Sequence, residues 1–247
     1  MILEAVFPTQ CVGCGDDGAW LCSECSDAIE FVSGNPCPGC GSLKREHDCQ
    51  GGLPPAPTPI SGIGSVGAHG NAPLAGLVAI GFYHDPRLRA LIHGLKYSNA
   101  TCLLPSFRSL LTRFKSQRRD PWPWAGEKEL GIQHVPGAPD RIRARGFDQA
   151  ELLRGIVKED AVPWATEMSR LVRTKTTKVQ ADLEPGPLRD ANVAKTFTFA
   201  SGSDPVPPAV ILVDDVFTTG ATMRAAARIL MSNGAERVYG FAFALGA

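Results

Sequence analysis

Residues 210–222, with the sequence VILVDDVFTTGAT, decide the fold of this chain. Four aliphatic residues lead into two adjacent acids, and a turn of threonine and glycine then precedes an Ala/Arg-rich helical pattern. Continuous apolar runs are typical of strands buried in parallel sheets. A Thr/Gly loop before a helix offers free backbone N–H groups to an anion, and two carboxylates at a strand end can hold sugar hydroxyls or a metal. The stretch therefore predicts a strand that ends in a site for a phosphorylated sugar.

The remaining sequence beyond residue 76 supplies further strands and helices. Strands are expected at 77–83, 130–135, 196–199, 210–213 and 238–245, and helices at 87–95, 106–115, 145–157 and 222–232. Asp85 followed by Pro86 is a typical helix start, because an N-cap acid precedes proline in the first turn. This pattern predicts an α/β fold, a parallel sheet flanked by helices. Ligands of such sheets bind beyond the carboxyl ends of the strands.

Composition indicates a globular protein with no global attraction to polyanions. The chain has 247 residues, 44% of them hydrophobic, with 25 basic and 25 acidic side chains. This balance gives nothing that recruits nucleic acid or an anionic membrane overall. The N-terminal sequence MILEAVFPTQC has neither a basic region nor a long apolar stretch, so no signal peptide is expected. We therefore expect a cytoplasmic protein without a membrane partner.

Seven of the eight cysteines fall between Cys11 and Cys49. Cys-x-x-Cys pairs in a chain without an export signal favour a metal over disulfides, and zinc over redox thiols. The candidate ligands are Cys11, Cys14, Cys22, Cys25, Cys37, Cys40, Cys49 and His47. They would fill two tetrahedral zinc sites, although one four-cysteine site with spare thiols is also consistent with the spacing. Closed four-ligand sites do no chemistry, so the zinc would be structural.

The composition along the chain predicts three parts. Residues 1–50 form the Cys-rich zinc-binding module, which includes a short helix at 26–31, residues 51–75 form a Gly/Pro-rich linker, and residues 76–247 form the α/β domain. Isolated hydrophobic side chains are expected to pack in the interior, and these are Cys102, Trp20, Trp122, Trp124 and Trp164.

The VILVDDVFTTGAT stretch resembles the phosphoribosyl pyrophosphate (PRPP) motif of type I phosphoribosyltransferases. Several further segments resemble the ComF family, bacterial proteins in which an N-terminal zinc module precedes a phosphoribosyltransferase-like domain, and which are associated with competence and DNA uptake. The matching segments are the Cys pairs, residues 94–97 (GLKY), residues 134–136 (HVP), residues 145–150 (RGFDQA), and Arg173, Gln180, Arg189 and Asn192. The resemblance covers nearly the whole chain. This sequence departs from the family in having Asp148 where asparagine is usual, and in an incomplete fourth cysteine element.

The resemblance implies roles for individual residues. Asp214 and Asp215 would accept hydrogen bonds from the ribose hydroxyls and help to hold Mg²⁺. The 5-phosphate would bind in the loop formed by Thr218, Thr219, Gly220, Ala221 and Thr222. Lys96 and Arg145 would face the pyrophosphate together with the backbone of Val135 and Pro136, and Arg141 and Arg143 are weaker candidates.

Two functions are compatible with these residues. One is a Mg²⁺- and PRPP-dependent transfer of the phosphoribosyl group to a nitrogen acceptor. The other is a non-catalytic adaptor in single-stranded DNA import that binds PRPP or a nucleotide and contacts a competence protein through the zinc module. Thr218 occupies a position where some relatives have an acid, which weakens the case for catalysis. The cysteine-rich region holds only Lys44 and Arg45 as cations, so contact with a protein is favoured over direct nucleic-acid binding.

Overall fold

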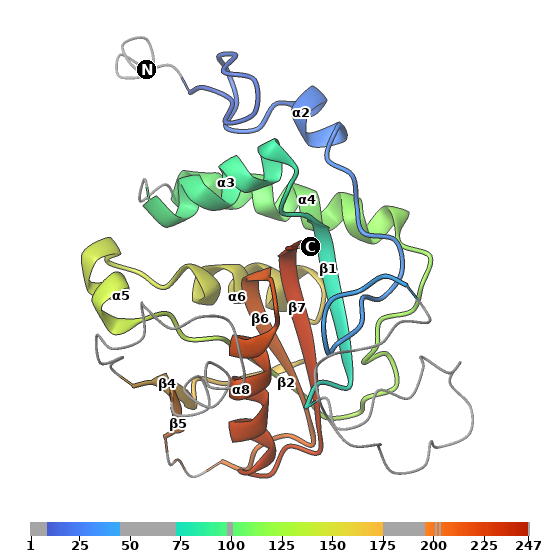
Figure 1. Cartoon of the computed structure of the whole chain (residues 1–247), viewed down its shortest axis with the longest axis vertical. Helices are drawn as coiled ribbons and strands as arrows, with labels where there is room; N and C mark the ends of the chain where they lie inside the picture. Colours follow the sequence, from blue (N-terminus) through green and yellow to red (C-terminus); the bar gives the residue numbers. More distant parts are fainter. Residues whose placement is uncertain are drawn as a thin grey trace.

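A five-stranded parallel sheet forms the centre of the protein (Figure 1). The computed structural model describes residues 9–44, 73–97, 101–174, 196–200, 202 and 204–246. Every neighbouring pair of strands in the sheet is parallel. The strand order is β1 (Gly76–Phe82), β7 (Arg237–Leu245), β6 (Ala209–Phe217), β2 (Leu130–His134) and β3 (Thr166–Glu167). The predicted fold class, a parallel sheet flanked by helices behind a Cys-rich module, is confirmed.

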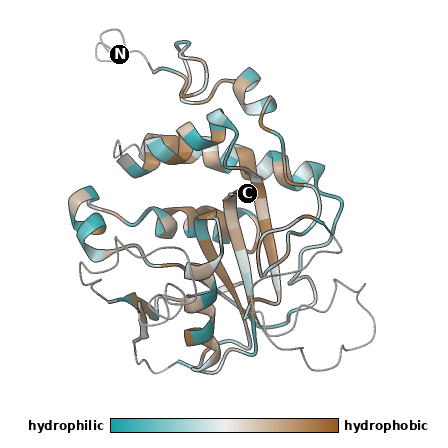
Figure 2. Cartoon of the chain, in the orientation of Figure 1, coloured by the Kyte–Doolittle hydropathy of each residue, from teal (hydrophilic) through white to brown (hydrophobic). Residues whose placement is uncertain are grey.

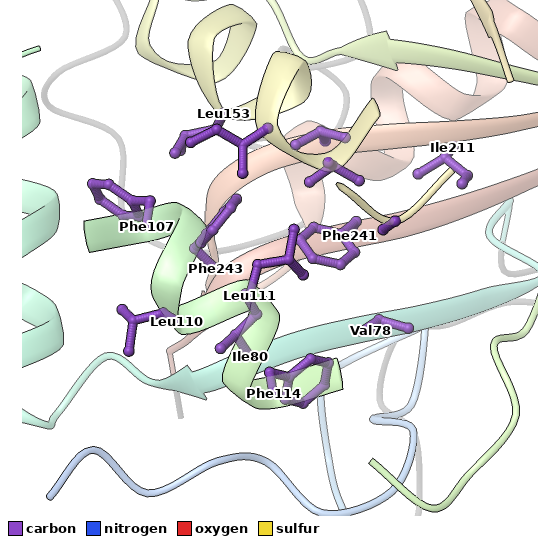
Figure 3. Packing of buried hydrophobic residues seen from close by; sticks show 14 of the residues in the cluster. Val78, Ile80, Phe107, Leu110, Leu111, Phe114, Leu153, Ile211, Phe241 and Phe243 are labelled. Atoms are coloured by element: carbon purple, nitrogen blue, oxygen red, sulfur yellow. The ribbon is translucent and has the colours of Figure 1, made fainter. Parts of the chain in front are cut away.

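Helices and a small hairpin cover both faces of this sheet (Figure 1). One face packs against α3 (Pro86–Tyr97), η1 (Thr101–Leu103), α4 (Leu104–Gln117) and α6 (Gln149–Asp160). Figure 3 shows Phe107 of α4 directed toward Phe243 of β7, and the two rings meet edge to face with their centroids 5.2 Å apart. The other face packs against α8 (Ala221–Met231) and the antiparallel pair β4 (Leu171–Arg173) and β5 (Phe197–Phe199).

The central strand β6 has the burial that its sequence predicts. Its first five residues are fully covered, because helices lie on both faces of the sheet. Figure 2 shows the strands mainly in the colours of hydrophobic residues, whereas hydrophobic and hydrophilic residues alternate along the helices. The strand is longer than the sequence indicated, since it continues through the two acids to Phe217 and pairs there with Leu245. Asp214 and Asp215 therefore sit on a rigid strand end rather than in a loop.

Two local predictions differ from the structure in part. The helix expected at 26–31 is α2 (Ser23–Asp27), because Cys22 acts as its N-cap and its Sγ accepts the N–H of Cys25. The strand expected at 196–199 is present as β5, but it pairs with β4 outside the parallel sheet. A further helix, α5 (Pro139–Arg145), escaped detection because it buries no residue and so has no apolar period.

The side chains expected to pack in the interior divide into two groups. Trp124 is buried and Trp122 is half-buried against it, with stacked rings 5.1 Å apart. Trp20, Trp164 and Cys102 are exposed, so the expectation was wrong for them. Hydrophobic character alone did not distinguish surface loops from the core, which is normal for isolated apolar residues.

The Cys-rich module is joined to the sheet through its C-terminal half. The backbone of Phe31 forms an antiparallel bridge with Gly81 of β1, and Val32 N–H donates to the carbonyl of Ile80 at 2.8 Å. The segment therefore covers the outer edge of β1, which would otherwise present unpaired backbone groups. None of the helices in the described part of the chain is long and apolar enough to cross a membrane.

Candidate functional site

The carboxyl end of β6 brings together three of the residues singled out from the sequence. Lys96, in the last turn of α3, places its Nζ 2.7 Å from Oδ2 of Asp215. Gln149, the first residue of α6, donates from Nε2 to the same Oδ2 at 3.4 Å. Arg145, the last residue of α5, donates from Nη1 to Oε1 of Gln149 at 2.5 Å. Lys96 and Gln149 thus contact one carboxylate directly, and Arg145 is linked to it through Gln149. Both predicted pyrophosphate-facing cations therefore belong to this network.

Asp214 is the second carboxylate of this site. Its Oδ1 accepts the backbone N–H of Asp215 at 2.8 Å. Burial raises the pKa of Asp214 well above its ordinary value, and the negative charge of Asp215 raises it further. Lys96 opposes this effect by favouring the ionised form. Two adjacent carboxylates that repel each other in a partly dry site favour a cation or hydroxyl donors as partners.

Asp148 ties the loop after β2 to the start of α6. Its Oδ2 accepts the N–H of Gly137 at 2.7 Å, and its Oδ1 accepts the N–H of Ala150 at 3.0 Å, so that both oxygens are used. The side chain is buried, and its Oδ2 lies 3.9 Å from Nε2 of His134. Burial lowers the pKa of His134, which favours the neutral imidazole. Asp148 therefore fixes the backbone at Val135, Pro136 and Gly137, which the sequence analysis placed beside the pyrophosphate.

Replacing Asp148 tests this role. An asparagine has only one acceptor oxygen, so Asp148→Asn can satisfy only one of the two N–H groups. We expect it to lower the free energy of unfolding by about 1 kcal/mol, and Asp148→Ala by about 2 kcal/mol, because alanine also removes the helix cap. Urea unfolding measures both values, with Glu151→Gln in the same helical turn as the control. Unchanged stability of Asp148→Ala would show that the loop is held by other contacts.

Residues 218–222, the predicted anion loop, lead from the end of β6 into α8. Gly220 adopts φ +71° and is the N-cap of α8. N–H groups of a first helical turn have no partner within the helix, and that of Ala221 donates to Oγ1 of Thr219 at 3.4 Å. Thr218 and Thr219 are exposed, whereas Ala221 and Thr222 are half-buried. A Cβ atom on Gly220 would lie 2.3 Å from Cζ of Phe217, so only glycine fits here. The loop follows directly on β6 and lies at the same end of the sheet as the two acids.

Arg173, which belongs to the segments that resemble the ComF family, is a further candidate residue of the site. It ends β4, and its Nε is buried without a hydrogen-bond partner among the described residues. Burial lowers its pKa, while the charge of Asp214 acts in the opposite direction, which places the guanidinium within electrostatic reach of the strand-end acids. Arg143 is exposed and forms an ion pair with Asp140, and Arg141 is exposed. Gln180, Arg189 and Asn192 lie outside the described residues.

Four cysteines of the N-terminal module form a metal site. The Sγ atoms of Cys11, Cys14, Cys22 and Cys25 all lie within 4.8 Å of one another. Tetrahedral zinc with Zn–S bonds of about 2.3 Å requires sulfurs about 3.8 Å apart, and the Sγ atoms of Cys14 and Cys22 are 3.8 Å apart. Although burial opposes it, the backbone N–H groups of Cys22, Cys14 and Gly13 lower the pKa of Cys11 to about 6. The four sulfurs therefore fit structural zinc.

Residues 37–41 form a second Cys-x-x-Cys-Gly turn, the second knuckle, which repeats the geometry of the first knuckle at residues 11–15. Gly39 N–H donates to Sγ of Cys37 at 3.3 Å, as Gly13 N–H donates to Sγ of Cys11 at 3.4 Å. The glycine after each pair has a positive φ, +81° at Gly41. His47 and Cys49, the predicted partners of this pair, lie outside the described residues.

Comparisons with known proteins agree with these two parts. The double zinc ribbon domain model matches residues 2–55. "DNA utilization protein YhgH" of Escherichia coli (strain K12) is 31% identical over 228 residues, which cover 90% of this chain and 88% of that protein. "Competence protein ComFC" of Streptococcus pneumoniae (strain ATCC BAA-255 / R6) is 23% identical over 229 residues, with coverages of 92% and 88%. "Competence protein ComFC" of Bacillus subtilis (strain 168) is 22% identical over 218 residues, with coverages of 87% and 79%.

The structure defines a class of proteins in which a zinc-binding Cys-rich module precedes a parallel α/β sheet. Within that class, the extent of the match to YhgH shows the family. The chain belongs to the ComF family.

Proposed function

We propose that this protein binds PRPP with Mg²⁺ at the carboxyl end of β6 and transfers the phosphoribosyl group to a nitrogen acceptor. The observation that carries the proposal is the contact of Lys96 and Gln149 with Asp215, with Arg145 bound to Gln149. The predicted anion loop follows on the same strand. A phosphorylated sugar that also bears pyrophosphate needs acceptors for its hydroxyl groups. It also needs cations and N–H donors for its phosphate groups.

The residues divide the ligand between them. Asp214 and Asp215 accept hydrogen bonds from the ribose hydroxyls, and the backbone and hydroxyls of residues 218–222 bind the 5-phosphate. Lys96, Arg145 and the backbone of residues 135–137 face the pyrophosphate. The carboxylates also fit Mg²⁺, which prefers oxygen ligands and, when bound, would neutralise charge on the pyrophosphate.

The reaction exchanges one bond at ribose C1 for another. The C1–oxygen bond breaks and its electron pair leaves with pyrophosphate, while a nitrogen lone pair forms the new C1–N bond and the proton of that nitrogen passes to solvent. Positive charge builds on the ribose in the transition state, as in glycosyl transfer generally. In this proposal the carboxylates of Asp214 and Asp215 would stabilise that charge, and positioning and electrostatics would supply most of the catalysis.

The second candidate is a non-catalytic adaptor in DNA uptake. Two observations favour it. Thr218 stands at the loop position where an acid would serve as base, and the relatives carry the names "Competence protein" and "DNA utilization protein". We propose a role in competence-related DNA handling in the cytoplasm, where cysteines stay available for zinc. In either case the proposed parts are the zinc-binding module at 1–50, the linker at 51–75 and the phosphoribosyltransferase-like domain at 76–247. The module would contact a DNA-import protein.

Pyrophosphate release separates the two candidates. The zinc-loaded full chain is incubated with PRPP, Mg²⁺ and a panel of purine and pyrimidine bases and amines. The enzymatic proposal expects release that requires both PRPP and one acceptor class, and that disappears in Asp215→Ala. Saturable PRPP binding without release for any acceptor supports the adaptor. Tight binding of single-stranded DNA in a gel shift at physiological salt would add direct nucleic-acid contact, which the few cations of the module do not favour.

A further inference from the structure

Arg224 connects the second cysteine knuckle to the anion loop. It lies in the first turn of α8 and is buried, with 8% of its surface exposed. Its Nη1 donates to the carbonyl of Gly39 at 2.6 Å and to the carbonyl of Thr219 at 2.6 Å. Gly39 lies between Cys37 and Cys40, and Thr219 lies in the middle of the loop. One guanidinium therefore connects two segments. Gly39 lies 185 residues before Arg224 in the sequence, and Thr219 lies 5 residues before it.

An apolar contact runs beside this polar one. A Cβ atom on Gly41 would lie 3.1 Å from Cδ1 of Leu245 and 3.4 Å from Cε1 of Phe217. The ring of Phe217 also closes over Gly220, since a Cβ atom there would lie 2.3 Å from its Cζ. The knuckle thus packs against the ends of β6 and β7, and Phe217 touches both the knuckle and the loop.

The contact at Thr219 determines how the loop presents its N–H groups. The described part of the chain contains no cis peptide bond, so the Thr219 carbonyl and the Gly220 N–H lie in one plane and point in opposite directions. Because Arg224 holds the carbonyl, the N–H of Gly220 faces away from the guanidinium. The opposite orientation would present a carbonyl oxygen to a phosphate, which repels it. The same guanidinium places a buried positive charge behind the loop.

We propose that Arg224 is a positioning residue through which the Cys37–Gly41 knuckle supports the anion loop. Whether the knuckle is folded then sets the affinity of the loop for a phosphate monoester. The connection itself is independent of the ligand. Its consequence for PRPP rests on the proposed function, because the order of the loop affects PRPP affinity only if the loop binds the 5-phosphate.

Paired substitutions in the two knuckles test the connection. Cys40→Ser perturbs the second knuckle, and its control, Cys14→Ser, perturbs the equivalent position of the first. Arg224→Met removes the guanidinium, and its control, Arg228→Met, removes an exposed arginine from the same helix. Amide hydrogen exchange of residues 216–222 is measured in each full-length variant without ligand. We expect Cys40→Ser and Arg224→Met each to accelerate exchange in the loop about tenfold, and the two controls to leave it unchanged.

The double variant distinguishes a shared connection from two separate defects. If knuckle and loop communicate through Arg224, Cys40→Ser adds little to Arg224→Met, because contacts in one network are not additive. Additive acceleration, or an equal effect of Cys14→Ser, overturns the proposal. Exchange across residues 237–245 shows whether a variant retains its fold. If Cys40→Ser loses its fold, Arg224→Met alone tests the proposal. The proposal requires that this variant exchange faster both in residues 36–42 and in the loop.

PRPP titration of the same variants separates this inference from the proposed function. We expect about tenfold weaker binding in Cys40→Ser and in Arg224→Met, and wild-type affinity in Cys14→Ser and Arg228→Met. If the wild type does not bind PRPP while the exchange pattern appears as expected, the connection stands and the proposed ligand is wrong. If PRPP binds equally to all variants and loop exchange is unchanged, the connection is wrong and the proposed function stands.

Discussion

Asp215→Ala is expected to weaken PRPP binding at least about 100-fold, the largest effect of any single substitution in the site. The carboxylate is the common partner of Lys96 and Gln149, and it would accept hydrogen bonds from the ribose. Hydrogen bonds to charged groups contribute about 1.5–3 kcal/mol each, so the loss of two gives a change of this size. Isothermal titration with PRPP and Mg²⁺ measures it. Glu129→Ala is the matched control, because Glu129 is exposed and precedes β2 at the opposite end of the sheet.

The pH dependence of binding gives a second readout of the same pair. Ionised Asp214 would accept hydroxyl hydrogen bonds more strongly than the protonated acid and would attract Mg²⁺. Its pKa is raised by burial and by the charge of Asp215. PRPP affinity should therefore increase as pH rises through this raised pKa, while the ionisation of Asp214 costs folding stability over the same range. In Asp215→Asn the like charge is absent, so the increase should begin at lower pH. A pH profile that is identical in both proteins would contradict the coupling of the two acids.

Cys11→Ser is expected to remove one zinc ion per chain and to unfold the first cysteine cluster. Structural zinc contributes about 10–16 kcal/mol of apparent binding free energy in small zinc modules, and Cys11 is the buried ligand that receives N–H groups from Gly13 and Cys22. Metal analysis measures the loss, and hydrogen exchange over residues 9–28 reports the unfolding. PRPP affinity should change less than about threefold, because Arg224 contacts the other knuckle.

Cys102→Ser serves as the control, since Cys102 is an exposed cysteine outside the cluster. It should retain the full zinc content and the exchange pattern of the wild type. Unchanged zinc in Cys11→Ser, or a wild-type protein that carries no zinc while its cysteines are reduced, would contradict the assignment of the four ligands.

Much of the fold follows from one stretch of sequence. The apolar run at residues 210–213 is typical of a strand covered on both faces, and the acids after such a strand lie at a carboxyl end of the sheet. The helix start at Asp85 was also readable, since Asp85 Oδ1 accepts the N–H groups of Arg87 and Leu88 as an N-cap does.

The parts that escaped prediction depend on contacts distant in sequence. No local pattern shows that Arg224, in an apparently ordinary helix, reaches Gly39, or that Gln149 links Arg145 to Asp215. The helix α5 has no buried side chain and so no hydrophobic period. The pairing of β4 with β5 spans residues 175–195, over which register cannot be inferred from periodicity.

Binding of PRPP to the zinc-loaded full chain is the most direct test of the proposed site. Titration with PRPP in Mg²⁺ is compared with ribose 5-phosphate and with pyrophosphate, each of which satisfies only one half of the site. We predict one PRPP per chain, bound at least about tenfold more tightly than either fragment, with the difference lost in Asp215→Ala. Absence of saturable PRPP binding, or equal affinity in the wild type and Asp215→Ala, would contradict the account.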